Sequence, residues 1–481
     1  MNKILNDWVV SSSVQFGTSG ARGLVSAMTA EVCYAYTQAF LRAVAPGAAE
    51  VVLGHDLRPS SPALVASCAQ AVTDSGLKVV FVGALPTPAV AYFASIRKAP
   101  SIIITGSHIP FDRNGIKFYR ASGEIGKADE KAMMETVVDA PSEWHPQSLP
   151  SVNAEAWTAY AQRYVSFFGK GALGGMRVAV YEHSSVARDL LREVLEALGA
   201  EVLSLGRADT FVPIDTEAVR PEDVAQARQW AGEYGFDAIL STDGDADRPL
   251  IGDEAGNWLR GDVVGILCAR FLGAEVVVTP VSSNTAVEKC GAFRQVLRTQ
   301  IGSPYVIGGM ESATSLDSRQ HGNDSPLVVG YEANGGFLLG SDVVRNGVVM
   351  SALPTRDALL PMLALLSMAR TRGCKLSELG LGLPNRFTAS DRLQSFPTQD
   401  SHALLDRLLA EPAAASELLA PQSGEVVTTD TTDGLRMTFA NGDIVHLRPS
   451  GNAPELRCYA ESESVERATE LCQGCLKRIR A

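Results

Sequence analysis

The sequence lacks an excess of basic residues. It has 42 lysines and arginines against 54 aspartates and glutamates, and its formal net charge is −12. Proteins that bind nucleic acids usually present a basic face, so this balance argues against a nucleic-acid partner. It leaves room for an anionic small molecule, because a local cluster of cations can override the overall charge.

Long apolar runs are also absent. Residues 1–15 contain Asp7 and lack the apolar core of a secretory signal. The most apolar helical stretch, 357–369, is too short to span a bilayer and contains Pro361. We therefore expect a cytoplasmic protein with no membrane partner.

The eight cysteines do not form a compact framework. They are scattered through a long chain, which is typical of reduced cytosolic thiols rather than disulfides. Cys472 and Cys475 have the spacing of a redox or zinc pair, but no second pair is nearby. We interpret them as ordinary residues of an amphipathic helix over 464–480.

A strand–helix–strand pattern occurs three times in the 481 residues. Each copy has an apolar strand, a polar loop with serines, a helical run and a second strand, which together predict a βαβ unit in an α/β domain. The predicted strand pairs are 50–54 with 78–82, 177–181 with 201–204, and 275–279 with 295–298.

The last part of the chain has a different pattern. A helical stretch over 401–419 precedes three short strand-like segments, with a hairpin signal at Asn441–Asp443. This predicts a smaller α+β domain with antiparallel strands. The predicted fold is thus three related α/β domains plus a C-terminal α+β domain, with domains at 1–150, 151–260, 261–375 and 376–481.

Ser107 stands in the most informative segment. The apolar run 102–104 predicts a buried strand, and the chain then enters a loop of small and polar residues. The strand end would hold the Ser107 hydroxyl in a fixed position, with the His108 imidazole beside it and Lys117 ten residues further on.

Three aspartates, Asp243, Asp245 and Asp247, follow a strand signal at alternate positions. Carboxylates so arranged can converge on one hard cation, and we predict a magnesium site. An EF-hand is disfavoured because Arg248 stands where that loop needs glycine and a strand precedes the loop. A solvated acidic turn stays an alternative.

Two further loops carry ligand-type side chains. Glu332 and Asn334 are separated by one residue, so in an extended loop they face the same way and suit vicinal sugar hydroxyls. The other loop could wrap a phosphate with a guanidinium, a hydroxyl, an amide and free backbone N–H groups. Taken alone, each loop could be an ordinary surface turn. The second loop consists of Arg448, Pro449, Ser450, Gly451 and Asn452.

A fifth loop, 16–23, is rich in glycine and contains a cation, Arg22. It lacks the spacing and the lysine of a P-loop.

Together, in this order and over four expected domains, these segments resemble the α-D-phosphohexomutase superfamily across essentially the whole chain. The resemblance is greatest to the phosphomannomutase and phosphoglucomutase branch. It implies four domains around a central cleft, each contributing one loop.

The resemblance also implies roles for the residues. Ser107 would be the phosphoserine, flanked by His108, and an oxygen of its phosphate would bind Mg²⁺ together with Asp243, Asp245 and Asp247. The cationic residues near the reacting hydroxyl would be Arg22 and Lys117, with a part in proton transfer and charge stabilisation. Arg248 would be an active-site arginine that follows the metal loop. The sugar hydroxyls would contact Glu332 and Asn334, and the non-reacting phosphate would contact Arg448, Ser450, Gly451 and Asn452.

The implied activity is the interconversion of a hexose 1-phosphate and 6-phosphate, most like a phosphomannomutase acting on mannose phosphates. A hexose 1,6-bisphosphate would be the bound intermediate, and the protein would be a monomer or homodimer. Phosphoglucomutase and phosphoglucosamine mutase are alternatives. An inactive phosphosugar-binding relative, or a hydrolase that uses the aspartate loop, is more remote.

Several positions depart from the superfamily pattern. Gly106 and Ile109 replace an alanine and an asparagine around the serine, and Gly336 stands where a histidine is common. Asn452 and its neighbour replace Thr-Glu in the final loop, and 302–305 lacks the usual charged or imidazole side chain of a specificity loop. These departures affect the identity of the sugar more than the reaction.

Overall fold

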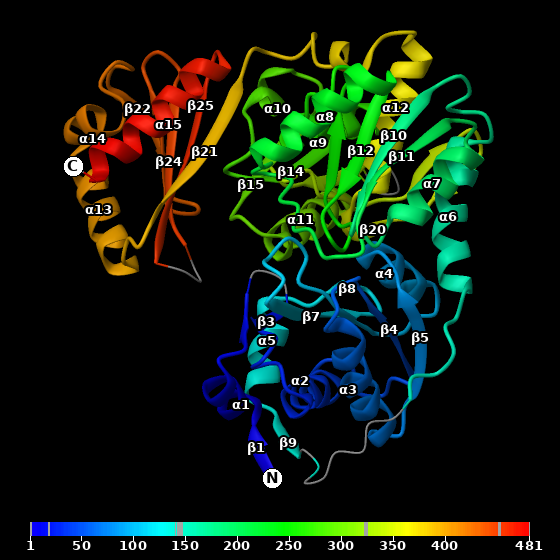
Figure 1. Ribbon diagram of the computed structural model, residues 1–481. Helices are drawn as coiled ribbons and strands as arrows, with labels where there is room; N and C mark the ends of the chain where they lie inside the picture. Colours follow the sequence, from blue (N-terminus) through cyan, green and yellow to red (C-terminus); the bar gives the residue numbers. More distant parts are fainter. Residues whose placement is uncertain are drawn as a thin grey trace.

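The computed structural model describes residues 2–17, 20–139, 141, 148–321, 326–450 and 454–480. The elements form three α/β units followed by a C-terminal α+β unit (Figure 1), which confirms the predicted fold class. The domain boundaries predicted at 150, 260 and 375 stay predictions. Among the described residues, no helix combines the length and apolarity that a bilayer crossing requires.

The first unit is built on the order β2-β3-β7-β6-β4-β5, with β8 paired to β7. Strands β4, β5 and β6 are parallel, as the βαβ pattern predicts, and β7 is antiparallel to β6. Its strands are β2 (Gln15–Phe16), β3 (Ala21–Leu24), β4 (Glu50–His55), β5 (Lys78–Ala84), β6 (Ser101–Ile104), β7 (Arg113–Arg120) and β8 (Gly123–Glu124). Its helices are α1 (Leu5–Ser12), α2 (Ala30–Ala43), α3 (Ser61–Asp74), α4 (Thr87–Ile96) and α5 (Lys127–Met134); β1 (Asn2–Ile4) pairs separately with β9 (Val137–Asp139).

The second and third units repeat the parallel core. Their sheet orders are β11-β10-β12-β13 and β15-β14-β16-β17-β20. The second contains α6 (Glu155–Phe168), β10 (Arg177–His183), α7 (Arg188–Ala197), β11 (Glu201–Arg207), α8 (Pro221–Tyr234), β12 (Ala238–Thr242) and β13 (Pro249–Gly252). The third contains α9 (Gly261–Leu272), β14 (Val276–Pro280), α10 (Ala286–Lys289), β15 (Gln295–Thr299), α11 (Ser303–His321), β16 (Val328–Tyr331), β17 (Phe337–Leu339), the hairpin β18 (Val343–Arg345) and β19 (Val348–Met350), β20 (Leu353–Asp357) and α12 (Leu359–Arg372).

The fourth unit is an antiparallel sheet in the order β21-β25-β24-β23-β22, with helices packed against it. Cys472 and Cys475 are buried, unpaired thiols on α15, as predicted. After the short 3₁₀ turn Leu376–Glu378, the unit consists of β21 (Phe387–Gln394), α13 (Thr398–Ala410), α14 (Pro412–Leu419), β22 (Val426–Asp430), β23 (Leu435–Phe439), β24 (Ile444–Pro449), β25 (Glu455–Ser462) and α15 (Val465–Arg480).

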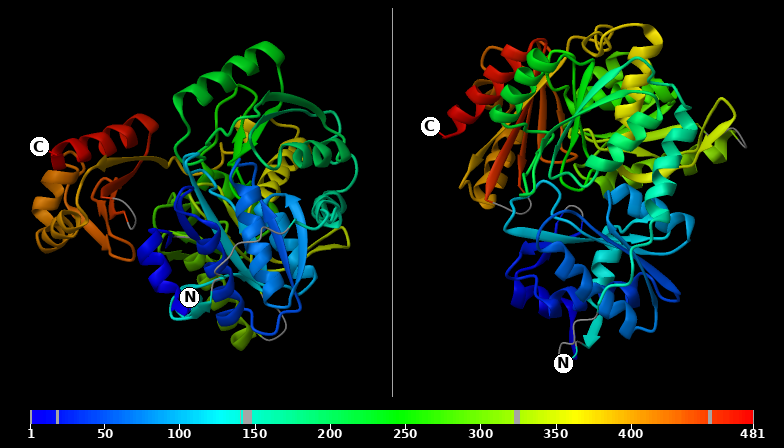
Figure 2. Two further views of the ribbon diagram at one scale, coloured as in Figure 1. Left: turned by 60° about the horizontal axis from the view of Figure 1, so that its bottom comes forward. Right: turned by 45° about the vertical axis from the view of Figure 1, so that its right-hand side comes forward.

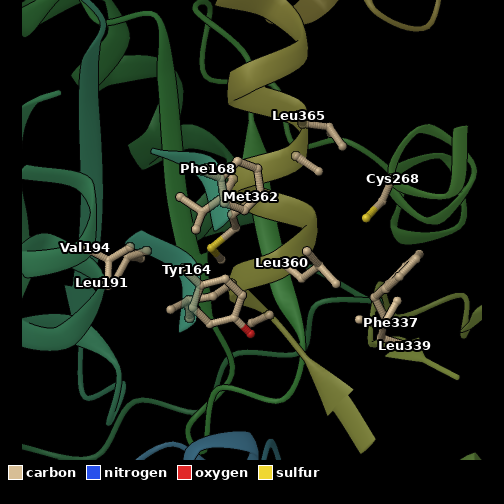
Figure 3. Packing of buried hydrophobic residues seen from close by; sticks show 14 of the residues in the cluster. Tyr164, Phe168, Leu191, Val194, Cys268, Phe337, Leu339, Leu360, Met362 and Leu365 are labelled. Carbon is tan, nitrogen blue, oxygen red and sulfur yellow. The ribbon is translucent and has the colours of Figure 1, made fainter. Parts of the chain in front are cut away.

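One hydrophobic cluster draws on all of the first three units, and α12 lies within it; the first unit also has a large cluster of its own. Leu360 and Met362 of this helix pack among side chains of the second unit, such as Leu191, and of the third, such as Phe337 (Figure 3). The fourth unit has a separate core and lies to one side in every view (Figure 2).

Two buried histidines should make the stability of the folded protein depend on pH. In His183 and His446, Nε2 lies 2.9 and 2.6 Å from a backbone carbonyl oxygen, and Nδ1 has no hydrogen-bond partner among the described residues. Burial lowers the pKa of both to about 4. Both imidazoles are therefore neutral when folded, whereas the unfolded chain takes up protons below about pH 6.5.

The contribution of the two histidines to the free energy of unfolding has its full value above about pH 6.5. It falls as the pH drops towards 4, by up to about 3 kcal/mol for each histidine. We expect the melting temperature to fall between pH 7 and pH 5, and His446→Gln to flatten this dependence. The control is His402→Gln on an exposed position of α13. An unchanged pH profile in His446→Gln would contradict the prediction.

Candidate active site

Several of the predicted site residues lie at the carboxyl ends of parallel strands. Ser107 follows β6, the aspartate trio follows β12, and Glu332 follows β16. In α/β sheets this edge is where ligands bind. Arg22 lies on β3 and Lys117 on β7, and these two strands pair directly.

Lys117 lies on a strand, because the loop after Ser107 ends where residues 113–120 form β7. This strand contains the pair Asn114-Gly115. A side chain at Gly115 would lie 2.7 Å from the Ala21 carbonyl oxygen, so this glycine serves the close approach of neighbouring strands.

The loop around Ser107 is held by Arg58, a fully buried residue that follows β4. Its guanidinium donates to the carbonyl oxygens of Ser107 (3.0 Å) and Pro110 (2.7 Å). A Cβ atom at position 106 would lie 2.4 Å from the Arg58 Cζ, which accounts for Gly106 in place of alanine. Ser107 itself has φ of 51°, a strained conformation that a tightly bonded loop can maintain.

The Ser107 hydroxyl points at the acidic trio. Its Oγ donates to Asp243 Oδ2 at 2.5 Å and lies 3.4 Å from His108 Nδ1. Ser107 is buried, with 1% of its surface exposed. The segments that sequence analysis singled out as phosphoserine and metal loops therefore meet directly.

The trio fits a hard cation. Ligand oxygens of Asp243, Asp245 and Asp247 all lie within 4.8 Å of one another, and the three side chains are buried. Lys117 Nζ donates to one oxygen of Asp245 (2.7 Å) and one of Asp247 (2.6 Å), and Thr87 also donates to Asp245 (2.6 Å). Oδ1 of both Asp245 and Asp247 is buried and accepts no hydrogen bond from the residues that the structure describes, as expected of oxygens that would bind a metal ion.

The charges in this site perturb one another. Burial, reinforced by Asp245 and Asp247, raises the pKa of Asp243 well above its usual value. Burial by itself would raise the pKa of Asp247. The positive charges of the nearby cations have the larger combined effect, so the pKa of Asp247 is lowered. Burial, reinforced by Arg248 and Arg356, lowers the pKa of Arg22 to about 10. Such mutual perturbation is characteristic of functional sites.

His108 is affected in the same way. Burial and the positive charges of Arg248 and Arg22 lower its pKa well below the usual value, although Asp215 opposes them. The imidazole beside Ser107 is therefore neutral at pH 7.

Glu332 and Asn334 form a tight buried turn. The Glu332 N–H donates to the Gly336 carbonyl at 3.0 Å, and Asn334 Oδ1 accepts from the Gly336 N–H at 2.9 Å. Arg356, at the end of β20, bonds Glu332 Oε2 at 3.0 Å and also bonds Asp247. The proposed sugar loop is thereby tied to the metal loop.

Arg448 and Ser450 lie in the fourth unit, where they line a cavity of about 470 Å³. Arg448 Nε donates to Asp433 Oδ2 at 2.8 Å, and the Ile301 N–H donates to the same oxygen at 2.9 Å. This carboxylate thus links the fourth unit to the third. Gly451 and Asn452 lie outside the described residues.

Three contributors were missed by sequence reasoning: Arg58, Thr87 and Arg356. Arg58 and Thr87 lie just beyond the ends of β4 and β5, and Arg356 lies near the end of β20. A search for polar residues near the carboxyl ends of strands could have found them. The segment 302–305 includes the start of α11, where Ser303 Oγ donates to Glu124 at 2.8 Å, and its part in sugar specificity stays a prediction.

The chain matches known proteins along nearly its whole length. Sequence models of the phosphoglucomutase/phosphomannomutase family match as α/β/α domain I over 13–143, domain II over 157–256, domain III over 260–387, and the C-terminal domain over 404–477. The chain therefore belongs to the phosphoglucomutase/phosphomannomutase family, within the α-D-phosphohexomutase superfamily.

Individual relatives point the same way. A phosphomannomutase from Salmonella muenchen is 45% identical, covering 100% of this chain and 99% of the relative. A phosphoglucosamine mutase from Nitratidesulfovibrio vulgaris is 30% identical over 95% of this chain and 96% of the relative. The crystal structure of a putative phosphomannomutase from Thermus thermophilus shares the fold, with a TM-score of 0.75 at 22% identity over 97% of this chain and 99% of that one. The chain is thus a mutase, an intramolecular phosphotransferase.

Proposed function

We propose that this mutase interconverts mannose 1-phosphate and mannose 6-phosphate through a phosphorylated Ser107. The observation that carries the proposal is the direct contact of Ser107 Oγ with Asp243, beside two more buried carboxylates, each with one oxygen that accepts no hydrogen bond from the described residues. The 45% identity with a phosphomannomutase over the full chain supports mannose as the sugar.

In the proposed first step, a sugar hydroxyl oxygen forms a bond to the phosphorus on Ser107 as the bond from Ser107 Oγ breaks. Asp243, Asp245 and Asp247 would hold Mg²⁺ together with an oxygen of the serine phosphate. When bound, the ion offsets negative charge on the transferring phosphoryl group. Arg22, Lys117 and Arg248 supply further positive charge. Overall the sugar hydroxyl loses one proton and the released Ser107 Oγ gains one, and we assign Arg22 and Lys117 to this proton transfer.

The product of this step is a bound 1,6-bisphosphate. After the sugar turns end for end, the other phosphate returns to Ser107. Glu332 and Asn334 would orient the sugar hydroxyls, and the phosphate that is not reacting would be bound by Arg448, Ser450, Gly451 and Asn452. These donors can serve either end of the sugar because a phosphate dianion accepts hydrogen bonds from many directions.

A comparison of substrates tests the choice of sugar. We expect the highest kcat/KM with mannose 1-phosphate when mannose, glucose and glucosamine 1-phosphates are assayed side by side by coupled product detection. A higher value with glucosamine 1-phosphate would instead favour the runner-up activity, to which the relative at 30% identity points.

A further inference from the structure

Arg356 bridges the two loops that would hold the metal and the sugar. Its Nε and Nη2 donate to Asp247 Oδ2 at 3.1 and 2.8 Å, and its Nη1 donates to Glu332 Oε2 at 3.0 Å. The side chain is 2% exposed, so these charge-assisted bonds form away from water. A planar guanidinium can make such a bridge, and a lysine ammonium cannot reproduce it.

The bridge leaves one oxygen available on each carboxylate. Asp247 Oδ2 accepts from both Arg356 and Lys117, whereas Asp247 Oδ1 accepts no hydrogen bond from the described residues and lies 3.6 Å from Arg248 Nε. Glu332 Oε1 accepts no hydrogen bond from the part of the chain that the structure describes. Arg356 therefore holds each of these two carboxylates by one oxygen, and the other oxygen of each stays available to the metal ion or the sugar.

Gly336 provides an independent observation. A Cβ atom at this position would lie 2.6 Å from Arg356 Cδ and 2.8 Å from its Cγ. Gly336 does not have a positive φ, so its backbone conformation does not itself require glycine. The passage of the Arg356 side chain is what excludes a larger residue here.

We propose that Arg356 is a positioning residue that couples sugar recognition to the metal site. It aligns Glu332 relative to Asp247, and its charge moderates the attraction of the trio for a divalent cation. This inference rests on the proposed function, because it assumes that Glu332 contacts the sugar and Asp247 the metal.

The test begins with Arg356→Met, which keeps much of the aliphatic volume. We expect KM for mannose 1-phosphate to rise about tenfold or more, since Glu332 loses its alignment. Mg²⁺, measured by calorimetry on protein of known phosphoryl content, should bind about tenfold more tightly because a nearby positive charge is gone. A variant that was merely damaged would bind the ion more weakly.

Arg356→Lys keeps the positive charge but loses the planar set of guanidinium N–H donors. It should therefore bind Mg²⁺ with the affinity of the native protein, while KM stays raised. Arg97→Met is the matched control, because Arg97 makes a comparable two-bond pair with Glu50 outside the site. Unchanged Mg²⁺ affinity and KM in Arg356→Met would overturn the inference.

A double-mutant cycle gives a second test. Gly336→Ala should displace Arg356 and raise KM, but should add little in an Arg356→Ala background, where the obstruction is absent. Additive losses would also overturn the inference. Failure of the proposed function is recognised separately, by normal turnover in Ser107→Ala.

Discussion

Ser107→Ala is expected to lower kcat by roughly 10⁴-fold or more, because the group that carries the phosphoryl is lost. The fold should remain intact, since Arg58 holds the loop through backbone carbonyls rather than through the Ser107 hydroxyl. Turnover of mannose 1-phosphate and the intact mass of the purified protein would be measured together.

The native protein should show a phosphoryl adduct of about 80 Da that is missing from Ser107→Ala. Ser101→Ala is a matched control on β6, since the Ser101 hydroxyl is also buried but has no hydrogen-bond partner within the described part of the chain. Normal turnover in Ser107→Ala would exclude the mechanism, even if an adduct were found elsewhere.

Removing divalent cations should also lower kcat by roughly 10³-fold or more, and adding Mg²⁺ should restore it. The reason is that the ion, when bound, would offset negative charge on the transferring phosphoryl group. Asp245→Asn should weaken Mg²⁺ binding by about tenfold or more, because it removes a charged ligand.

Calorimetric titration with Mg²⁺ reports this loss independently of activity. Asp391→Asn is a control, because Asp391 is an exposed aspartate of β21. Full turnover in thoroughly chelated protein, or unaltered Mg²⁺ binding in Asp245→Asn, would argue that the trio is not a metal site.

The sequence was sufficient to predict elements whose signals are local. Ser107 follows an apolar run, and the three aspartates alternate after another, so each motif could be recognised within about ten residues. The three βαβ units were predictable for the same reason, since each combines adjacent strand and helix periodicities.

Contacts between distant segments could not be predicted in this way. Arg356 and Asp247 are 109 positions apart, and Arg58 and Ser107 are 49 apart. The substitutions at Gly106 and Gly336 were visible in the sequence, but their cause was not. In both cases an arginine from another segment occupies the space that a Cβ atom would need.

The separate core of the fourth unit has an evolutionary consequence. Changes inside that core leave the packing around α12 undisturbed, because the two clusters do not share residues. Core substitutions in the fourth unit can therefore accumulate without repacking the other units, while polar contacts such as that of Asp433 with Ile301 still tie its surface to the third unit. Substitutions around α12 must instead fit side chains from three units at once, because that cluster draws on all three.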